Sequence, residues 1–213
     1  MNNLFLAKII EDPRIYGSWM VLIIFSVCCH ELLHALAAKW LGDSTAADAG
    51  HITLNPLKQM GWTALILLLL LGITWGQVPV NPRRLTQKSS RVMVSLAGVA
   101  ANFILAVIFA VLTVIAIKLN APLLYHFFTL GTLLNLILAL FNLLPVPPLD
   151  GFAALRELFP YLDRFNTTEF GKGTMLFLFF AVFCFGVNSI FNFGAVIADW
   201  LITFIMRLFS GGV

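Results

Sequence analysis

Charge is scarce in this 213-residue sequence. Only 11% of its residues are Asp, Glu, Lys or Arg, whereas an average soluble domain has about 25%. Hydrophobic residues make up 60% of the chain, and its mean hydropathy is +0.95. A net charge of +3 is too small to indicate nucleic acid as a partner. The composition therefore predicts an integral membrane protein that is surrounded by a lipid bilayer.

Cysteine and strand-like patterns are also scarce. The three cysteines, Cys28, Cys29 and Cys184, all lie in apolar segments, which is typical of buried thiols and excludes a secreted disulfide framework. Ten-residue segments of alternating hydrophobicity, which are typical of membrane barrels, are absent. The apolar runs are instead long enough to span a bilayer as helices. We therefore expect an all-α integral membrane fold, without a cleavable signal peptide.

The apolar runs predict a bundle of about five to six membrane segments in one polytopic domain, residues 1–213. A run at 62–76 would be about 22 Å long as a helix, which is shorter than a hydrocarbon core of about 30 Å. Prolines follow this run, so a re-entrant or short segment is expected near 62–80. The other expected segments are 17–41, 91–117, 122–144 and two short or tilted helices within 173–209. The catalytic core is expected at about 17–160, and a small strand near 50–56.

The sequence His30-Glu31-Leu32-Leu33-His34 lies inside the first apolar run. Residues four apart share one face of a helix, so the two imidazoles can bind one metal ion. Neutral imidazoles suit Zn²⁺, and Glu31 is placed to act as general base toward a metal-activated water. A carboxylate inside a membrane costs about 2.5 kcal/mol or more, which favours a functional role over histidines that only bridge helices.

A proline-rich turn ends the fourth apolar run and carries Asp150. Three prolines in four positions cannot continue a helix, so Asp150 is predicted at the membrane edge. There it can complete a His₂Asp zinc site, or it can cap the following helix. Asn142 is a candidate catalytic residue that could orient a substrate carbonyl or donate to an oxyanion. His51 is the rival third ligand, and Asn102 is interpreted as a contact between helices.

Positive charges give an expectation for membrane orientation. A shared metal requires the end of the first span and Asp150 to lie on one face, which a re-entrant 62–80 segment allows. Nine cations then fall on the active-site side and three on the other, so the active-site side is predicted to face the cytoplasm. The nine are Lys39, Lys58, Arg83, Arg84, Lys88, Arg91, Arg156, Arg164 and Lys172, and the three are Lys8, Arg14 and Lys118.

Taken together, these motifs resemble the site-2 protease family of intramembrane zinc metalloproteases. The resemblance rests on HELLH and on the stretch NLLPVPPLDG at 142–151, and it covers most of residues 22–160. One departure is Val99, where the family commonly has proline, a change that bears on helix geometry. Three further stretches agree: GHITLNP at 50–56, PVNPRR at 79–84 and SLAGVAAN at 95–102.

The resemblance implies one Zn²⁺ per chain, bound by His30, His34 and Asp150, with Glu31 as catalytic base. It implies hydrolysis of a peptide bond within or next to a transmembrane segment of a protein or peptide substrate, as in regulated intramembrane proteolysis. The chain resembles the compact branch of the family, so no PDZ-type regulation is expected. Two alternatives remain: a catalytically silent scaffold of the same fold, and a metal-handling transporter. Fe²⁺ or Co²⁺ would also suit the ligands.

Overall fold

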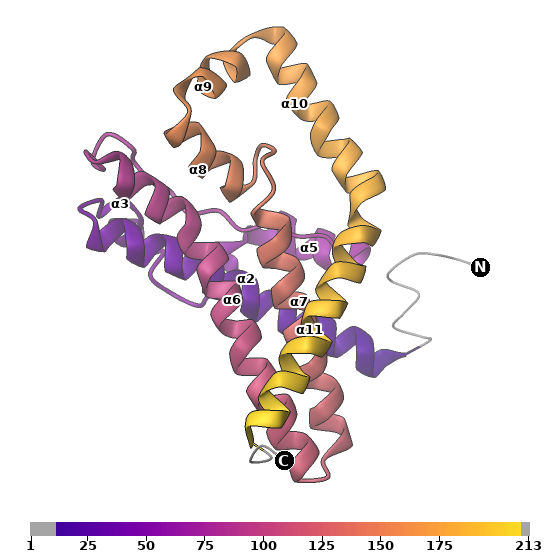
Figure 1. The fold of residues 1–213 in the computed structure, drawn as a ribbon. Helices are drawn as coiled ribbons and strands as arrows, with labels where there is room; N and C mark the ends of the chain where they lie inside the picture. Colours follow the sequence, from indigo (N-terminus) through magenta and orange to yellow (C-terminus); the bar gives the residue numbers. More distant parts are fainter. Residues whose placement is uncertain (1–11, 210–213) are drawn as a thin grey trace.

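A computed structural model describes residues 12–209 of the chain (Figure 1). Helices account for most of these residues, and no strand occurs among them. The all-α prediction is therefore confirmed for the described part of the chain. The elements are α2 (Pro13–Trp40), α3 (Thr45–Asp48), α4 (Pro56–Gln59), α5 (Gly61–Leu71), α6 (Lys88–Lys118), α7 (Pro122–Asn142), α8 (Asp150–Leu158), α9 (Pro160–Thr167), α10 (Glu169–Ala181), the π-helical η2 (Val182–Gly186) and α11 (Val187–Phe209).

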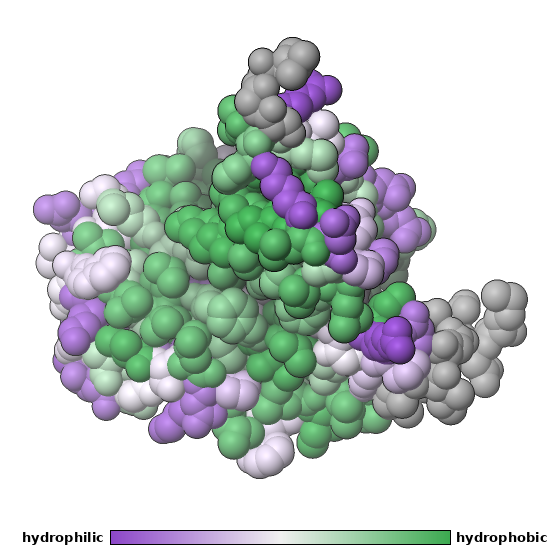
Figure 2. Space-filling view, turned by 90° about the horizontal axis from the view of Figure 1, so that it is seen from below, coloured by the Kyte–Doolittle hydropathy of each residue, from purple (hydrophilic) through white to green (hydrophobic). Residues whose placement is uncertain are grey.

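Four helices are long and apolar enough to cross a membrane: α2, α6, α7 and the continuous helix Glu169–Phe209. α2 begins at a proline, and Asp12 caps it by accepting a hydrogen bond from the backbone N–H of Ile15 at 3.1 Å. Hydrophobic residues also cover much of the molecular surface, as the view from below shows (Figure 2). This surface suits a protein that is surrounded by lipid.

α2, α6 and α7 pack together to form the core of the molecule. Leu22 and Val27 of α2 meet Phe109 of α6 and Leu134 of α7 in one buried cluster. Gly131 of α7 allows a close approach, because a Cβ there would lie only 2.9 Å from the Phe109 ring. This close packing fixes the three helices that carry or surround the candidate site.

The C-terminal region differs from the prediction of two short or tilted helices within 173–209. It forms one helix over Glu169–Phe209, in which η2 adds a π-helical turn between α10 and α11. No proline interrupts this region, and the polar side chains of Asn188 and Asn192 are exposed without breaking the backbone. Its 41 residues extend about 60 Å, twice the thickness of a hydrocarbon core. α10 consequently stands apart from the bundle (Figure 1).

The segment between α4 and α6 makes an excursion from the chain at Gln59 and returns to the same place. α5 has 11 residues and ends at Gly72, whose φ of +74° is left-handed. The backbone N–H of Gln77 then donates to the carbonyl of Gln59 at 2.8 Å, so the two ends of the excursion meet. Trp62 and Trp75 lie near these ends and are exposed, as interfacial anchors commonly are. A short segment was predicted here, and the structure has one.

The predicted strand near 50–56 is wrong. Residues 51–55 form bends and irregular backbone that pairs with no other segment of the described chain. The reason lies in Gln59, whose buried side chain donates to the carbonyls of His51 at 2.8 Å and Thr53 at 2.7 Å. These bonds curl the segment around one amide group, so its carbonyls are not available to a neighbouring strand.

Candidate metal centre

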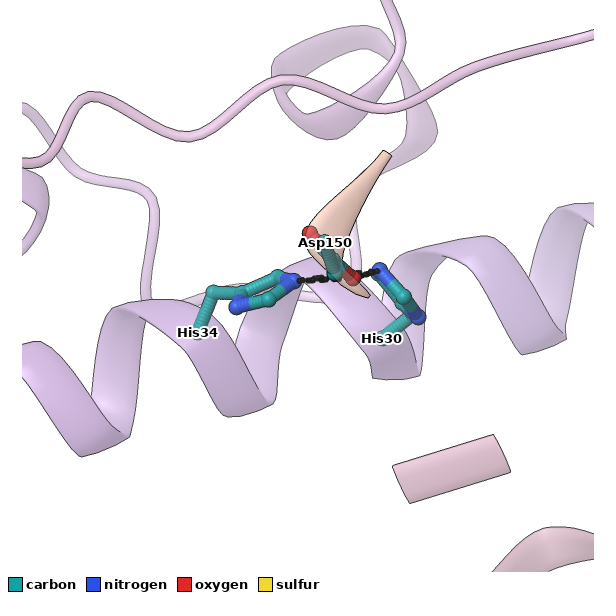
Figure 3. A group of neighbouring side chains, drawn as sticks. All are labelled: His30, His34 and Asp150. Atoms are coloured by element: carbon teal, nitrogen blue, oxygen red, sulfur yellow. Dashed lines mark hydrogen bonds and ion pairs between the residues drawn. The ribbon is translucent and has the colours of Figure 1, made fainter. Parts of the chain in front are cut away.

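Three side chains from distant parts of the sequence converge on one point (Figure 3). His30 and His34 project from the same face of α2, one turn apart, and Asp150 reaches them from the first residue of α8. Asp150 Oδ2 lies 3.0 Å from His30 Nε2 and 3.2 Å from His34 Nε2. The two Nε2 atoms are themselves 3.0 Å apart. Both imidazoles are buried.

The chemistry of these atoms fits a bound cation. His34 Nδ1 donates to the carbonyl of Val94 at 2.7 Å, and a carbonyl can only accept. In a neutral imidazole the Nε2 atom of His34 therefore carries no proton, and its lone pair faces the carboxylate of Asp150. Asp150 Oδ2 is buried and receives no hydrogen bond from the described residues. Ligands of a tetrahedral Zn²⁺ lie about 3.4 Å apart, so only a modest opening is required.

Glycine at two positions brings backbone against these side chains. A Cβ on Gly98 of α6 would overlap the Nε2 atoms of His30 and His34, and a Cβ on Gly76 would overlap the carboxylate of Glu31. Any other residue would displace the groups that meet there. Both glycines are thus part of the wall around the candidate centre.

Glu31 and His34 open onto a cavity of about 380 Å³. The cavity is covered on one side by residues 76–81, an irregular segment that we call the strap. Arg91, Ser95 and Glu157 add polar groups to its wall. The centre therefore borders a space large enough for several residues of peptide and for water, next to a carboxylate that is not one of the three converging ligands.

α8 is held in place by ion pairing with α6, and this contact positions Asp150. Arg91 Nε donates to Glu157 Oε2 at 2.5 Å, while the same guanidinium donates to the carbonyl of Leu85 at 2.8 Å. Lys88 Nζ also donates to the carbonyl of Leu158 at 3.0 Å. The first turn of α8 is thereby directed toward α2.

A buried carboxylate holds the strap at the end of α2. Asp43 accepts hydrogen bonds from the backbone N–H of Asn81 at 2.6 Å and from the hydroxyl of Thr45 at 2.5 Å. Burial alone would raise the pKa of Asp43, but these hydrogen bonds and the nearby Arg84 hold it below its usual range. The ionised carboxylate thus ties the strap to the helix that carries the two histidines.

The other residues singled out in the sequence lie apart from this point. Asn142 donates from Nδ2 to the carbonyl of Leu138 in its own helix at 3.0 Å, and it does not line the cavity beside Glu31. His51 lies 3.4 Å from Gln59 Oε1 through Nδ1 and does not join the converging group. Cys28 is buried in the packed core, so the structure gives it a packing environment.

The sequence analysis missed the residues that surround the ligands. Asn102, interpreted as a contact between helices, lies 2.6 Å from His30 Nδ1 through its Oδ1 atom. Gly98 and Gly76 were given no role at all. A signal for Asn102 was present, because a polar side chain in the middle of an apolar run is expensive unless it has a partner. A glycine gives no such signal in the sequence, because its role depends on which side chains lie against it in the folded structure.

The fold and the centre define a polytopic helical membrane protein in which the two histidines of an HExxH sequence and a distant aspartate form a candidate metal site. The chain belongs to the site-2 protease family of membrane zinc metalloproteases, peptidase family M50. The model described as "Peptidase family M50" matches residues 113–186.

Curated relatives carry the same assignment in their names. "Putative zinc metalloprotease YwhC" of Bacillus subtilis (strain 168) is 39% identical over 160 residues, which cover 70% of this chain and 73% of that protein. "Putative zinc metalloprotease Rip2" of Mycolicibacterium smegmatis is 34% identical over 162 residues, which cover 71% of this chain and 61% of that protein. The chain thus spans less than two thirds of Rip2. No solved structure matches the chain.

Proposed function

We propose that this chain is an intramembrane zinc endopeptidase that hydrolyses a peptide bond within or next to a transmembrane segment of another membrane protein. The observation that carries the proposal is the meeting of His30, His34 and Asp150 beside Glu31 at the edge of one cavity. Zinc in the names of the relatives supports the choice of metal. Regulated intramembrane proteolysis is the process in which such an activity acts.

The chemistry follows from the positions of the side chains. His30, His34 and Asp150 would hold a Zn²⁺, which would supply a lowered pKa of about 7 for a water molecule and a Lewis acid toward a carbonyl group. Glu31 accepts the proton of the attacking water and then passes it to the leaving amine. The strap excludes bulk water from one side of the cavity. Asn142 could serve the oxyanion only after its amide breaks its hydrogen bond to the carbonyl of Leu138 and turns toward the cavity.

The depth of the centre supports a substrate that lies in the membrane. Gly98 and Asn102, which contact the histidines, lie near the middle of the 31-residue helix α6. A helical substrate hides its carbonyls in its own hydrogen bonds, so it must unwind locally before attack. Arg91 and Glu157 add a charged pair to the cavity wall formed by the strap and α8, and we expect water to enter on this side.

We place the active-site side in the cytoplasm. Lys8 lies outside the described residues. The C-terminal end of α11 lies beside Lys118, because Lys118 Nζ donates to the carbonyl of Phe209 at 2.8 Å. Arg207 therefore joins the opposite side, together with Arg14 and Lys118. The nine cations on the active-site side still exceed these three, and such an excess faces the cytoplasm.

Cleavage of a single-span reporter by purified protein in detergent tests the proposal. Wild type is compared with Glu31→Gln, and the zinc content of both is measured. We expect one zinc in each, cleavage within the span by wild type, and a loss of about 10²- to 10⁴-fold or more in Glu31→Gln. Glu169→Gln, which removes an exposed carboxylate on α10, is the matched control and should cleave as wild type does.

Other results would point to the two alternative functions. Zinc in both proteins with no cleavage of any span in a panel would contradict proteolysis and favour a silent scaffold. Zinc flux in proteoliposomes would instead indicate a transporter. Absence of zinc from wild type would show that the three converging residues are not a metal site.

A further inference from the structure

A chain of buried polar side chains crosses the three core helices and ends at a candidate metal ligand. Asn135 of α7 contacts Ser26 of α2 at 2.9 Å and Asn102 of α6 at 3.0 Å. Asn102 in turn contacts His30 Nδ1 at 2.6 Å. Ser26, Asn102 and Asn135 are fully buried, at 0% exposure. Polar groups inside an apolar bundle are retained where they are fully paired, so this chain needs an explanation beyond packing.

One backbone carbonyl fixes the direction of every hydrogen bond in this chain. The carbonyl of Gly131 accepts from an atom of the Asn135 amide at 2.9 Å, and since a carbonyl can only accept, that atom is Nδ2. The Oδ1 atom of Asn135 therefore faces Asn102, whose Nδ2 must donate to it. The Oδ1 atom of Asn102 is then the atom that faces His30, so His30 Nδ1 must carry a proton.

We propose that Asn102 and Asn135 are positioning residues that hold His30 in the tautomer with a proton on Nδ1 and a lone pair on Nε2. This inference rests on the metal centre of the proposed function. His34 is set in the same way by the carbonyl of Val94. Both Nε2 lone pairs then face the position between the ligands, with no proton to be displaced before a cation binds.

A positioning residue and a residue that only joins helices have different effects on zinc binding. A residue that only joins helices would change the stability of the fold and leave the intrinsic zinc affinity unchanged. An acceptor for Nδ1–H determines which ring nitrogen is free. Without it, the neutral imidazole of His30 gains by moving its proton to Nε2, where the proton competes directly with the metal.

Zinc competition with a chromophoric chelator, in detergent and at fixed pH, tests the inference on three variants. Asn102→Leu removes the acceptor and should weaken zinc binding about 10- to 100-fold. Asn102→Asp keeps an acceptor for His30 and should retain affinity within about threefold of wild type, even where its unfolding temperature falls. Thr113→Val is the matched control, because Thr113 is a fully buried polar residue of α6 whose hydroxyl donates to the carbonyl of Phe109 in its own helix.

A second measurement does not depend on whether the variants fold. In the metal-free wild-type protein labelled with ¹⁵N-histidine, the nitrogen chemical shifts should place the proton of His30 on Nδ1. A proton on Nε2 would overturn the inference, and so would equal losses of zinc affinity in Asn102→Leu and Asn102→Asp. These readouts do not involve cleavage, so a failure of proteolysis and a failure of this inference are distinguishable.

Discussion

At the scale of single residues, the candidate centre depends on the lack of a Cβ atom at two glycines as well as on its converging side chains. Gly98 supplies no ligand and no proton, yet its lack of a Cβ leaves the space in which two imidazoles meet. The same holds for Gly76 beside Glu31. Each of these glycines allows a backbone from another part of the chain to approach a reactive group within van der Waals distance.

Gly98→Ala should therefore weaken zinc binding by about 10- to 100-fold, because the new methyl group displaces both histidines. The helix itself should tolerate the change, since alanine is a better helix former than glycine. Chelator competition on the purified protein measures the effect. Gly173→Ala is the control, because a Cβ on Gly173 meets nothing within 4 Å. Equal zinc affinities in the two variants would show that the histidines can move aside freely.

The convergence of His30, His34 and Asp150 could be predicted from the sequence, because their residue types and spacing are those of candidate metal ligands. His30, Glu31 and His34 share one helical face by simple periodicity, and Asp150 follows a turn that its prolines enforce. The partners of these residues could not be predicted. Asn102 meets His30 only because α2 and α6 cross at that point, and Asn102 and Asn135 pair only because α6 and α7 pack there.

At the scale of elements, the strap and α8 form two walls of the cavity beside α2, the helix that carries the histidines. The strap contacts this helix through a small apolar cluster in which Val80 packs with Ala38. Asp43 at the end of α2 accepts a hydrogen bond from the strap, and the ion pair between Arg91 and Glu157 links α8 to α6. The geometry of the cavity thus depends on these charged groups as well as on apolar packing.

The Asp43 contact should give the protein a distinct pH dependence. The pKa of Asp43 in the folded protein is below its usual value of about 3.9, so its contribution to stability is present above that value. It is lost as the pH falls through the lower pKa of the folded state. Asp43→Asn should be destabilised by about 1–2 kcal/mol at neutral pH, and the difference from wild type should vanish in strong acid.

Thermal unfolding of wild type and Asp43→Asn over a range of pH measures this difference. Asp48→Asn, which alters an exposed carboxylate in the adjacent helix α3, is the control and should follow wild type. A difference that stays constant down to the lowest pH would show that the ionised form of Asp43 has no special role.

At the scale of the whole molecule, the bundle has two unlike ends. One end holds the strap, α8 and α9, and the other holds the α6–α7 turn and the end of α11 (Figure 1). Apolar runs predicted α6 and α7 to within three residues. The C-terminal helix could not be predicted in the same way. An apolar run longer than a bilayer suggests two spans, and only the lack of a proline indicates one continuous helix.

The orientation of these two ends can be measured by labelling introduced cysteines in intact cells. Thr86→Cys should be protected from an impermeant maleimide added outside, while Leu119→Cys, in the turn before α7, should react. Both side chains are exposed. Wild type, which already contains Cys28, Cys29 and Cys184, gives the background. Labelling of Thr86→Cys from outside would reverse the proposed orientation.

The hydrogen bond between Gln59 and Gln77 has a consequence for the evolution of such a protein. Because the ends of this loop are tied together, its exposed part can change in length or composition with little effect on what precedes or follows it, whereas its buried residues Met60, Ala64 and Leu68 pack in the core. The candidate ligands and Glu31 lie outside this loop, on α2 and α8. Variation at exposed residues of the loop, such as Ile66 and Leu70, can therefore adapt the molecule to a different bilayer or protein substrate, while Gly76 keeps the space beside Glu31.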